Sequence, residues 1–179
     1  MPIFAHISGP TGSGKTTLGK LIKKMFPNVI IQDLDEFSEL SVNSDMKKME
    51  KDINKLIIKF CKKNNKSPII FTGTNSISSN RDFSDAIYYK IDAKYKYFIN
   101  IDTEIVLRRR FERHIEYMKN NIDHYFNKCV KKGKLIIDFE LWEKKIKEPY
   151  KSGWFHKNNY IFLDNKQICK DIKKNMTIS

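Results

Sequence analysis

The sequence predicts an α/β fold in which a five-stranded parallel sheet carries helices on both faces. Short apolar runs without a polar face alternate with longer segments whose apolar residues recur every three or four positions. The chain of 179 residues is long enough for a domain with a hydrophobic core, and 40% of it is hydrophobic. Neither an internal repeat nor a low-complexity linker divides it. We therefore expect residues 1–179 to form a single domain.

The strands and helices of this fold are predicted from apolar patterning. Five predominantly apolar segments are expected to form buried strands, namely residues 3–7, 28–32, 68–72, 96–101 and 160–163. Helical periodicity predicts helices at residues 16–25, 45–63, 103–118, 138–148 and 166–174. Ser44 precedes the second of these helices and is its predicted cap.

The stretch after the first predicted strand, GPTGSGKT, matches the phosphate-binding pattern G-x-x-x-x-G-K-[ST] at every fixed position. Its glycines allow turns in which successive N–H groups point inward, and the following helix adds its N-terminal dipole. Lys15 is expected to reach the β- and γ-phosphates of ATP, and the Thr16 hydroxyl to hold Mg²⁺. This motif places the fold among the P-loop NTPases. The residues expected to bind the nucleotide are Gly9, Pro10, Thr11, Gly12, Ser13, Gly14, Lys15, Thr16 and Thr17.

Acidic residues follow the second predicted strand in the sequence IIQDLDEF. Ligands of a doubly wound sheet bind at the carboxyl ends of its strands, which here lie beside the phosphate loop. We therefore expect one of the carboxylates Asp33, Asp35 and Glu36 to accept the proton of an attacking hydroxyl and a neighbouring one to hold a Mg²⁺-bound water. The alternative is that these carboxylates only cap the next helix.

Four of the five arginines fall within six residues, at Arg108, Arg109, Arg110 and Arg113. The guanidinium group grips phosphate oxygens with two donors at once. At helical spacing Arg109 and Arg113 can converge, so we predict that they act on the transferring phosphate from a helical lid around residues 106–137. The alternative is a solvated helix face. The fifth arginine, Arg81, could bind the phosphate acceptor or could simply cap a loop.

Other phosphate-loop chemistries lack their sequence signals here. The guanine-binding pattern N-K-x-D is broken, because Gln167 and Ile168 follow Asn165 and Lys166. An apolar strand that ends in Asp-Glu, usual in motor ATPases, is also missing. The third predicted strand continues as GTN and not Asp-Gly, which leaves the Mg²⁺ ligands open. Asp164 and Asn165 are weak candidates for the edge of the adenine, and an ordinary strand-to-helix turn capped by Asp164 is the favoured interpretation.

About the first 40 residues resemble the P-loop nucleoside kinases of the uridine kinase and nicotinamide riboside kinase group. The resemblance is carried by SGPTGSGKTTLGKLIKKMFPN and by the later DEF. It implies that Asp35 is the residue that activates the acceptor hydroxyl. The Asp-x-Asp spacing also resembles shikimate kinase, which implies a metal-side role for Asp33. LRRRFER is similar to the arginine-rich lid of the nucleoside kinases, and residues 142–150 are faintly similar to an acceptor-side helix.

These features together predict an ATP- and Mg²⁺-dependent kinase that acts on a hydroxyl of a small nucleoside-like molecule. One alternative is a nucleoside monophosphate kinase, whose arginines would hold the acceptor phosphate. The net charge of +13 leaves a nucleic-acid-binding or 5′-end kinase as another, although the lysines are spread over the whole chain. The sequence does not indicate an oligomeric state.

The cysteines and hydropathy indicate a cytoplasmic, intracellular protein. Cys61, Cys129 and Cys169 are odd in number and widely spaced, which is typical of reduced thiols. Neither a secretory signal nor an apolar run of about 20 residues is visible. We therefore expect no membrane partner.

Overall fold

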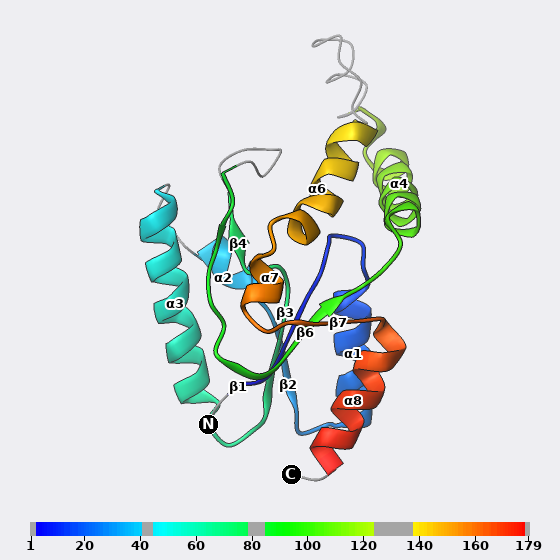
Figure 1. Cartoon of the computed structure of the whole chain (residues 1–179). Coiled ribbons are helices and arrows are strands. Elements are labelled where there is room, and N and C mark those ends of the chain that lie inside the picture. The colour runs from blue at the N-terminus through cyan, green and yellow to red at the C-terminus, as the bar shows by residue number, and fades with distance from the viewer. Residues whose placement is uncertain (1–2, 41–44, 79–84, 124–137, 178–179) are drawn as a thin grey trace.

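A computed structural model describes residues 3–40, 45–78, 85–123 and 138–177. Five parallel strands form the central sheet in the order β2-β3-β1-β6-β7 (Figure 1). They are β1 (Ile3–Ser8), β2 (Ile30–Asp33), β3 (Ile69–Thr72), β6 (Ala93–Ile99) and β7 (Ile161–Leu163). The predicted fold class and all five predicted strands are confirmed. The largest boundary shift is in β6, which starts three residues before the predicted 96.

The register of the sheet gathers the ends of its strands at one edge. Thr72 pairs with Asp33 on one side and with Ile7 on the other, so β1, β2 and β3 end side by side. The phosphate loop leaves β1 at this edge, and Asp33 is the last residue of β2. The predicted meeting of the phosphate loop with the acidic segment therefore follows directly from the strand pairing.

Helices cover both faces of the sheet, as predicted (Figure 1). On one face α1 (Lys15–Met25) and α8 (Asn165–Thr177) pack on Ala5, Ile7 and Tyr97. On the other, α2 (Asp35–Leu40) and α3 (Met46–Lys63) pack on Phe71 and Ile69. The N-cap of α3 is Asp45, which accepts a hydrogen bond from the Lys48 N–H at 2.9 Å, and not the predicted Ser44.

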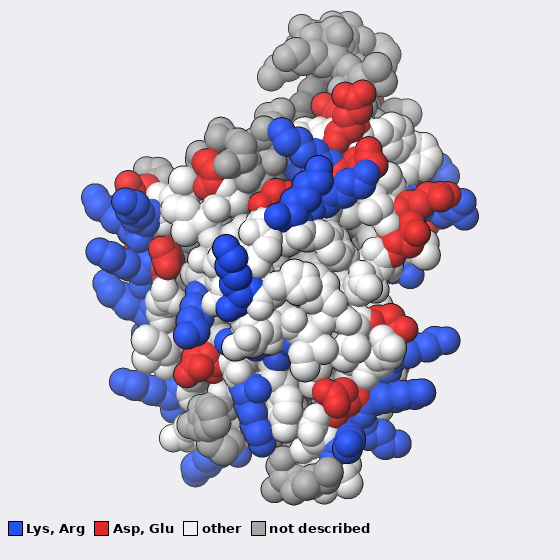
Figure 2. All heavy atoms as spheres, viewed as in Figure 1, with Lys and Arg blue, Asp and Glu red and all other residues white. Residues whose placement is uncertain are grey.

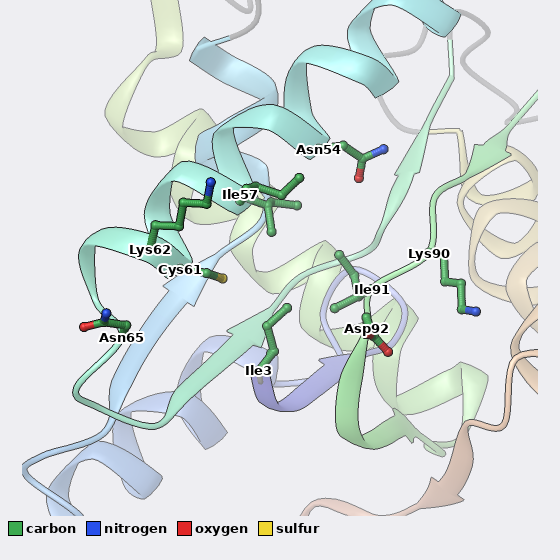
Figure 3. Close-up of a pocket in the computed structure, with 10 residues that line it drawn as sticks. Ile3, Asn54, Ile57, Cys61, Lys62, Asn65, Lys90, Ile91 and Asp92 are labelled. Carbon is green, nitrogen blue, oxygen red and sulfur yellow. The ribbon is translucent and has the colours of Figure 1, made fainter. Parts of the chain in front are cut away.

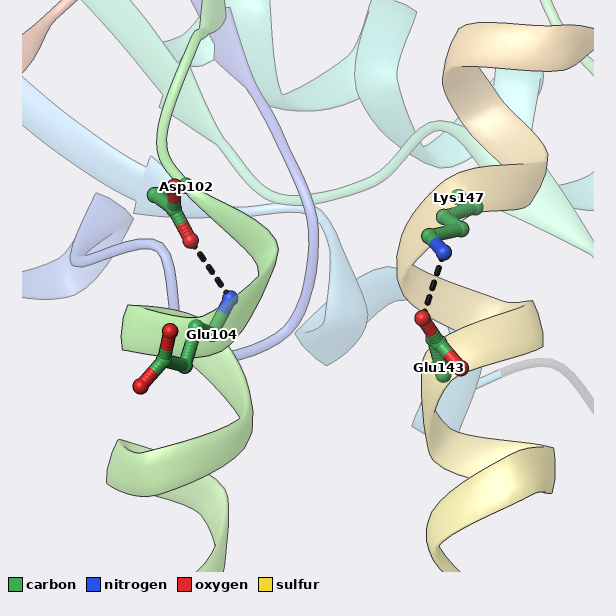
Figure 4. A network of polar contacts seen from close by, with 4 residues as sticks. All are labelled: Asp102, Glu104, Glu143 and Lys147. Atoms are coloured by element: carbon green, nitrogen blue, oxygen red, sulfur yellow. Dashed lines mark hydrogen bonds and ion pairs between the residues drawn. The ribbon is translucent and has the colours of Figure 1, made fainter.

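Two helices extend beyond the sheet near the phosphate loop, α4 (Thr103–Asn120) and α6 (Phe139–Lys151). They pack against each other at the upper right of Figure 1. Figure 4 shows a polar contact in each: Asp102 caps α4 by accepting from the Glu104 N–H at 2.7 Å, and Lys147 pairs with Glu143 within α6. Residues 124–137 of the predicted lid lie outside the described residues.

The sequence did not predict three small elements. The hairpin of β4 (Ser76–Ile77) and β5 (Ile87–Tyr88) is antiparallel, and α2 and α7 (Trp154–Lys157) are one- to two-turn helices. Their stability comes from tertiary contacts, since isolated helices of this length are marginal in water. Phe37 of α2 packs edge-to-face on Phe60 and Phe71 with ring centroids 5.6 and 5.9 Å away. None of the described helices is long and apolar enough to cross a membrane.

Gly19 provides a direct test of the packing of α1 on the sheet. A Cβ at this position would lie 2.9 Å from Cγ2 of Ile31 and 3.3 Å from Cγ2 of Thr72. Both neighbours are stiff β-branched side chains. We expect Gly19→Ala to lower the free energy of unfolding by roughly 1 kcal/mol, because overpacking exceeds the gain in helix propensity.

Urea denaturation measures this effect. Lys20→Ala, at an exposed position of the same helix, serves as the control and should stay near wild type. A Gly19→Ala protein more stable than wild type would show that the helix can move away from the sheet.

Candidate functional site

The phosphate loop between β1 and α1 requires its glycines. Gly9, Gly12 and Gly14 have φ values of 153°, 95° and 96°. A Cβ on Gly9 would lie 2.9 Å from the Ser13 hydroxyl. Gly14 is the left-handed N-cap of α1, so the first N–H groups of this helix, which have no intrahelical acceptor, face the loop. The loop has the concave form that an anion-binding helix N-terminus needs.

Lys15 folds back over this loop. Its Nζ donates to the carbonyl of Gly9 at 2.7 Å and to that of Pro10 at 3.1 Å. Burial lowers the pKa of Lys15 to about 8, although the carboxylates of Asp35 and Asp33 act in the opposite direction. The ammonium group is therefore charged at pH 7 and already lies at the loop, where phosphate oxygens could replace the two carbonyls.

The two carboxylates after β2 face different surroundings. Asp33 Oδ1 accepts a hydrogen bond from the Asp35 N–H at 3.1 Å, so Asp33 caps α2. Burial raises the pKa of Asp35, with smaller contributions from the charges of Asp33 and Glu39, while Lys15 opposes the shift. The alternative that these carboxylates cap the next helix therefore describes Asp33. The Asp35 carboxylate, in contrast, lies near the Lys15 ammonium group.

A cavity of about 240 Å³ lies between Asp35 and Lys15 on one side and α6 on the other. Its remaining polar lining comes from Thr11, from Thr74 and Ser76 near β4, from Tyr88 of β5, from Arg110 of α4, and from Lys145 and Glu148 of α6. The Tyr88 hydroxyl donates to Glu148, so the hairpin and α6 are joined across this cavity. Sequence reasoning missed Tyr88 and Glu148. Only the faint family similarity of residues 142–150 pointed to α6.

Oxygen donors suited to Mg²⁺ lie in a neighbouring depression. Thr16, Asp33 and Thr72 all line it, and the Thr72 hydroxyl is 3.5 Å from Asp33 Oδ2. The described residues contain no group of three or more His, Cys, Asp or Glu side chains that could hold a metal. Mg²⁺ commonly keeps several waters and is bound by one or two carboxylates together with substrate phosphates. The Thr16 hydroxyl and the carboxylates of Asp33 and Glu36 are oxygen donors of this kind, and they line the depression together with Lys20, Lys23 and Lys24.

The arginines of α4 have separate surroundings. Arg109 Nη1 is 3.4 Å from the Gly12 carbonyl of the phosphate loop. Arg110 lies over the Trp142 ring at 4.9 Å, and burial together with the charge of Arg113 lowers its pKa. Arg108 is exposed and lies 3.9 Å from Glu104, so the solvated-face alternative describes this residue. Arg81 lies outside the described residues.

The C-terminal segment also reaches the phosphate loop. Asn165 Nδ2 donates to the Ser13 carbonyl at 3.1 Å and would lie 3.1 Å from a Cβ on Gly14. Asp164 caps α8 by accepting from the Gln167 N–H at 2.8 Å. Of the two candidates for the adenine edge, Asn165 is beside the loop and Asp164 is engaged as a helix cap.

A larger cavity, of about 540 Å³, lies away from this site (Figure 3). Ile3 at the start of β1, Ile91 and Asp92 just before β6, and residues of the C-terminal half of α3 line it. It is therefore at the amino ends of the strands, opposite the phosphate loop. In Figure 3 the charged ends of Lys62 and Lys90 point in different directions and do not converge on it.

Basic side chains are scattered over the surface. Figure 2 shows lysine and arginine in several separate groups on one face, most densely along its left edge, with acidic side chains between them. The left edge in this view is α3, which carries lysines along its length. On this face the charge forms no continuous track of the kind that a nucleic-acid backbone follows.

No protein-family model matches the chain, and no curated protein matches it. Solved structures do. A shikimate kinase from Bacteroides thetaiotaomicron aligns over 98% of this chain and 98% of its own, with a TM-score of 0.56 and 15% identity. A shikimate kinase from Acinetobacter baumannii, in complex with shikimate, aligns over 99% of this chain and 94% of its own, with a TM-score of 0.50 and 14% identity. A chain of the Pnkp1/Rnl/Hen1 RNA repair complex aligns over 86% of this chain and 46% of its own, with a TM-score of 0.50 and 21% identity.

At these identities the likeness shows the fold alone, an α/β fold with a five-stranded parallel sheet that this chain shares with the two shikimate kinases. The predicted closeness to uridine kinase and nicotinamide riboside kinase is not confirmed.

Proposed function

We propose that the protein is an ATP- and Mg²⁺-dependent kinase that phosphorylates a hydroxyl of a small, nucleoside-like molecule. The observation that carries the proposal is that Lys15 of the phosphate loop and Asp35 of α2 line the same cavity. A phosphate donor and a proton acceptor are the two parts that such a transfer needs side by side. The kinase fold of the structural neighbours supports it.

In the proposed reaction ATP and the acceptor are both substrates. The Asp35 carboxylate takes the proton of the acceptor hydroxyl while the oxygen of that hydroxyl forms a bond to the γ-phosphorus. The bond between the γ-phosphorus and the β–γ bridging oxygen breaks at the same time, which releases ADP. Lys15 and Arg109 hold the phosphates and balance their charge. Arg113, one turn further along α4, is proposed to join them. Thr16 and Asp33 would hold Mg²⁺, which neutralises charge on the β- and γ-oxygens.

A transfer screen with γ-³²P-ATP tests this function. The acceptors are nucleosides, shikimate, nucleoside monophosphates and oligonucleotides with a 5′-hydroxyl. We expect label on a small hydroxyl compound, and about 10³-fold slower labelling with Lys15→Ala protein. Label on a nucleoside monophosphate would favour the monophosphate kinase instead.

The 5′-end kinase stays a second candidate, because one structural neighbour belongs to an RNA repair complex and the net charge is +13. It predicts transfer to the oligonucleotide, with binding that weakens steeply as salt rises. If the phosphate is transferred to a small acceptor at a rate that does not change between low and moderate salt, the 5′-end kinase is rejected.

A further inference from the structure

His6 is a fully buried polar residue in the middle of β1 that the proposed reaction does not use. Its Nε2 is 3.1 Å from the carbonyl oxygen of Gly73, and its Nδ1 is 2.6 Å from the hydroxyl of Tyr160. A carbonyl can only accept, so Nε2 carries the hydrogen and Nδ1 accepts from Tyr160. Burial lowers the pKa of His6 to about 3, in spite of the bond to Gly73, and the ring is neutral.

The turn after β3 is held to β1 through both polar groups of Gly73. The Gly73 N–H donates to the Ile7 carbonyl at 3.2 Å, while its own carbonyl accepts from His6. A buried imidazole is costly unless hydrogen-bonded, and both ring nitrogens of His6 are used. The position of Gly73 is therefore set by two consecutive residues of the strand that leads into the phosphate loop.

This turn contacts the candidate site at two points. Gly73 has a φ of 123° and lies so close to Asp33 that a Cβ would be 2.8 Å from its Oδ1. The next residue, Thr74, donates to the Gly9 carbonyl at 3.1 Å, the same oxygen that accepts from Lys15. The turn thus forms a wall against the carboxylate proposed for the metal side and is tied to the phosphate loop.

We propose that His6 is a positioning residue, which holds the Gly73 turn and thereby directs the Asp33 carboxylate toward Thr16. This inference rests on the proposed function, since it assigns His6 to the Mg²⁺·ATP side of that site. Residues that orient a metal ligand from behind typically contribute 10–100-fold to metal affinity or activity, and about this effect is expected here.

Two variants of His6 separate positioning from packing. The amide nitrogen of His6→Gln can reach the place of Nε2 and donate to Gly73, whereas that of the shorter His6→Asn cannot. Tyr160→Phe removes the hydroxyl and leaves the donor to Gly73, so it is the matched control. For each protein, calorimetry measures the dissociation constant of ATP in EDTA and in excess Mg²⁺, and urea denaturation measures the fold.

We expect all proteins to bind ATP alike in EDTA, because the phosphate loop is unchanged. Mg²⁺ should improve the affinity of wild type, His6→Gln and Tyr160→Phe to a similar degree, and that improvement should be smaller by about 10-fold or more in His6→Asn. An undiminished Mg²⁺ effect in folded His6→Asn overturns the role of His6.

If His6→Asn does not fold, the double variant His6→Phe/Tyr160→Phe replaces it, because it removes the imidazole and the hydroxyl that bonds to it together, so that only the Gly73 carbonyl loses its donor. A full Mg²⁺ effect there overturns the proposal in the same way, and a reduced one supports it. Wild-type protein that binds no ATP would overturn the proposed function itself, a result distinct from a failure of the His6 assignment.

Discussion

Lys15→Ala is expected to lower the rate of phosphoryl transfer by about 10³-fold, the loss seen when a preorganised donor to a developing charge is removed. The ammonium group already lies at the loop, 2.7 Å from the Gly9 carbonyl. Transfer from γ-³²P-ATP under saturating acceptor measures the effect. Lys20→Ala, an exposed lysine on the same helix, should retain full activity.

The pKa of Lys15 adds a second readout. Because this pKa is lowered to about 8, the group loses its proton as the pH rises through that value. We expect the affinity for ATP to decline above pH 8 in wild type, since the neutral amine attracts phosphate less. The decline should be missing in Lys15→Ala. An identical pH profile in both proteins would show that Lys15 does not bind the nucleotide.

Asp35→Asn is expected to leave ATP binding near wild type and to lower kcat by about 10²–10⁴-fold, the usual contribution of a general base. The asparagine keeps the shape of the side chain but cannot take a proton. Glu50→Gln is the control, because Glu50 lies in α3 and lines neither the cavity beside Asp35 nor the depression beside Thr16. Full turnover in Asp35→Asn would remove Asp35 from the mechanism.

The pH dependence of kcat tests the same residue. The pKa of Asp35 is raised by burial and by its acidic neighbours, and only the ionised carboxylate accepts a proton. Activity should therefore fall with decreasing pH around a midpoint above the ordinary value for aspartate. Asp35→Asn should retain its residual rate without this decrease.

The strands of the sheet could be predicted because each is an apolar run that only a buried strand or a buried helix accommodates. The phosphate loop could be predicted because its glycines are required by backbone conformation, as the φ values of Gly12 and Gly14 show. Neither depends on distant residues. The small elements α2, α7 and the β4–β5 hairpin lack such local signals and are stabilised by distant contacts, such as that between Phe37 and Phe71.

The residues of the candidate site also fall into those with a local sequence signal and those brought together only by the fold. Lys15, Thr16, Asp33 and Asp35 could be proposed from the sequence, because a short motif, a strand end and a family resemblance single them out. The cavity beside Asp35 was not, because Tyr88 and Glu148 come from separate elements and meet only in the folded chain. His6 was assigned no role from the sequence, since an isolated histidine in an apolar strand gives no sign of its partner 67 residues away.

The sequence alone therefore determined the fold class and the conformation of the glycine-rich loop that we propose binds phosphate, because backbone geometry and burial impose residue types within a few positions of one another. The cavity beside Asp35 and the contacts of the Gly73 turn with Asp33 were decided by the tertiary structure. Their residues are selected by contacts between β1, the turn after β3, the hairpin and α6, and such contacts leave no pattern in any one segment.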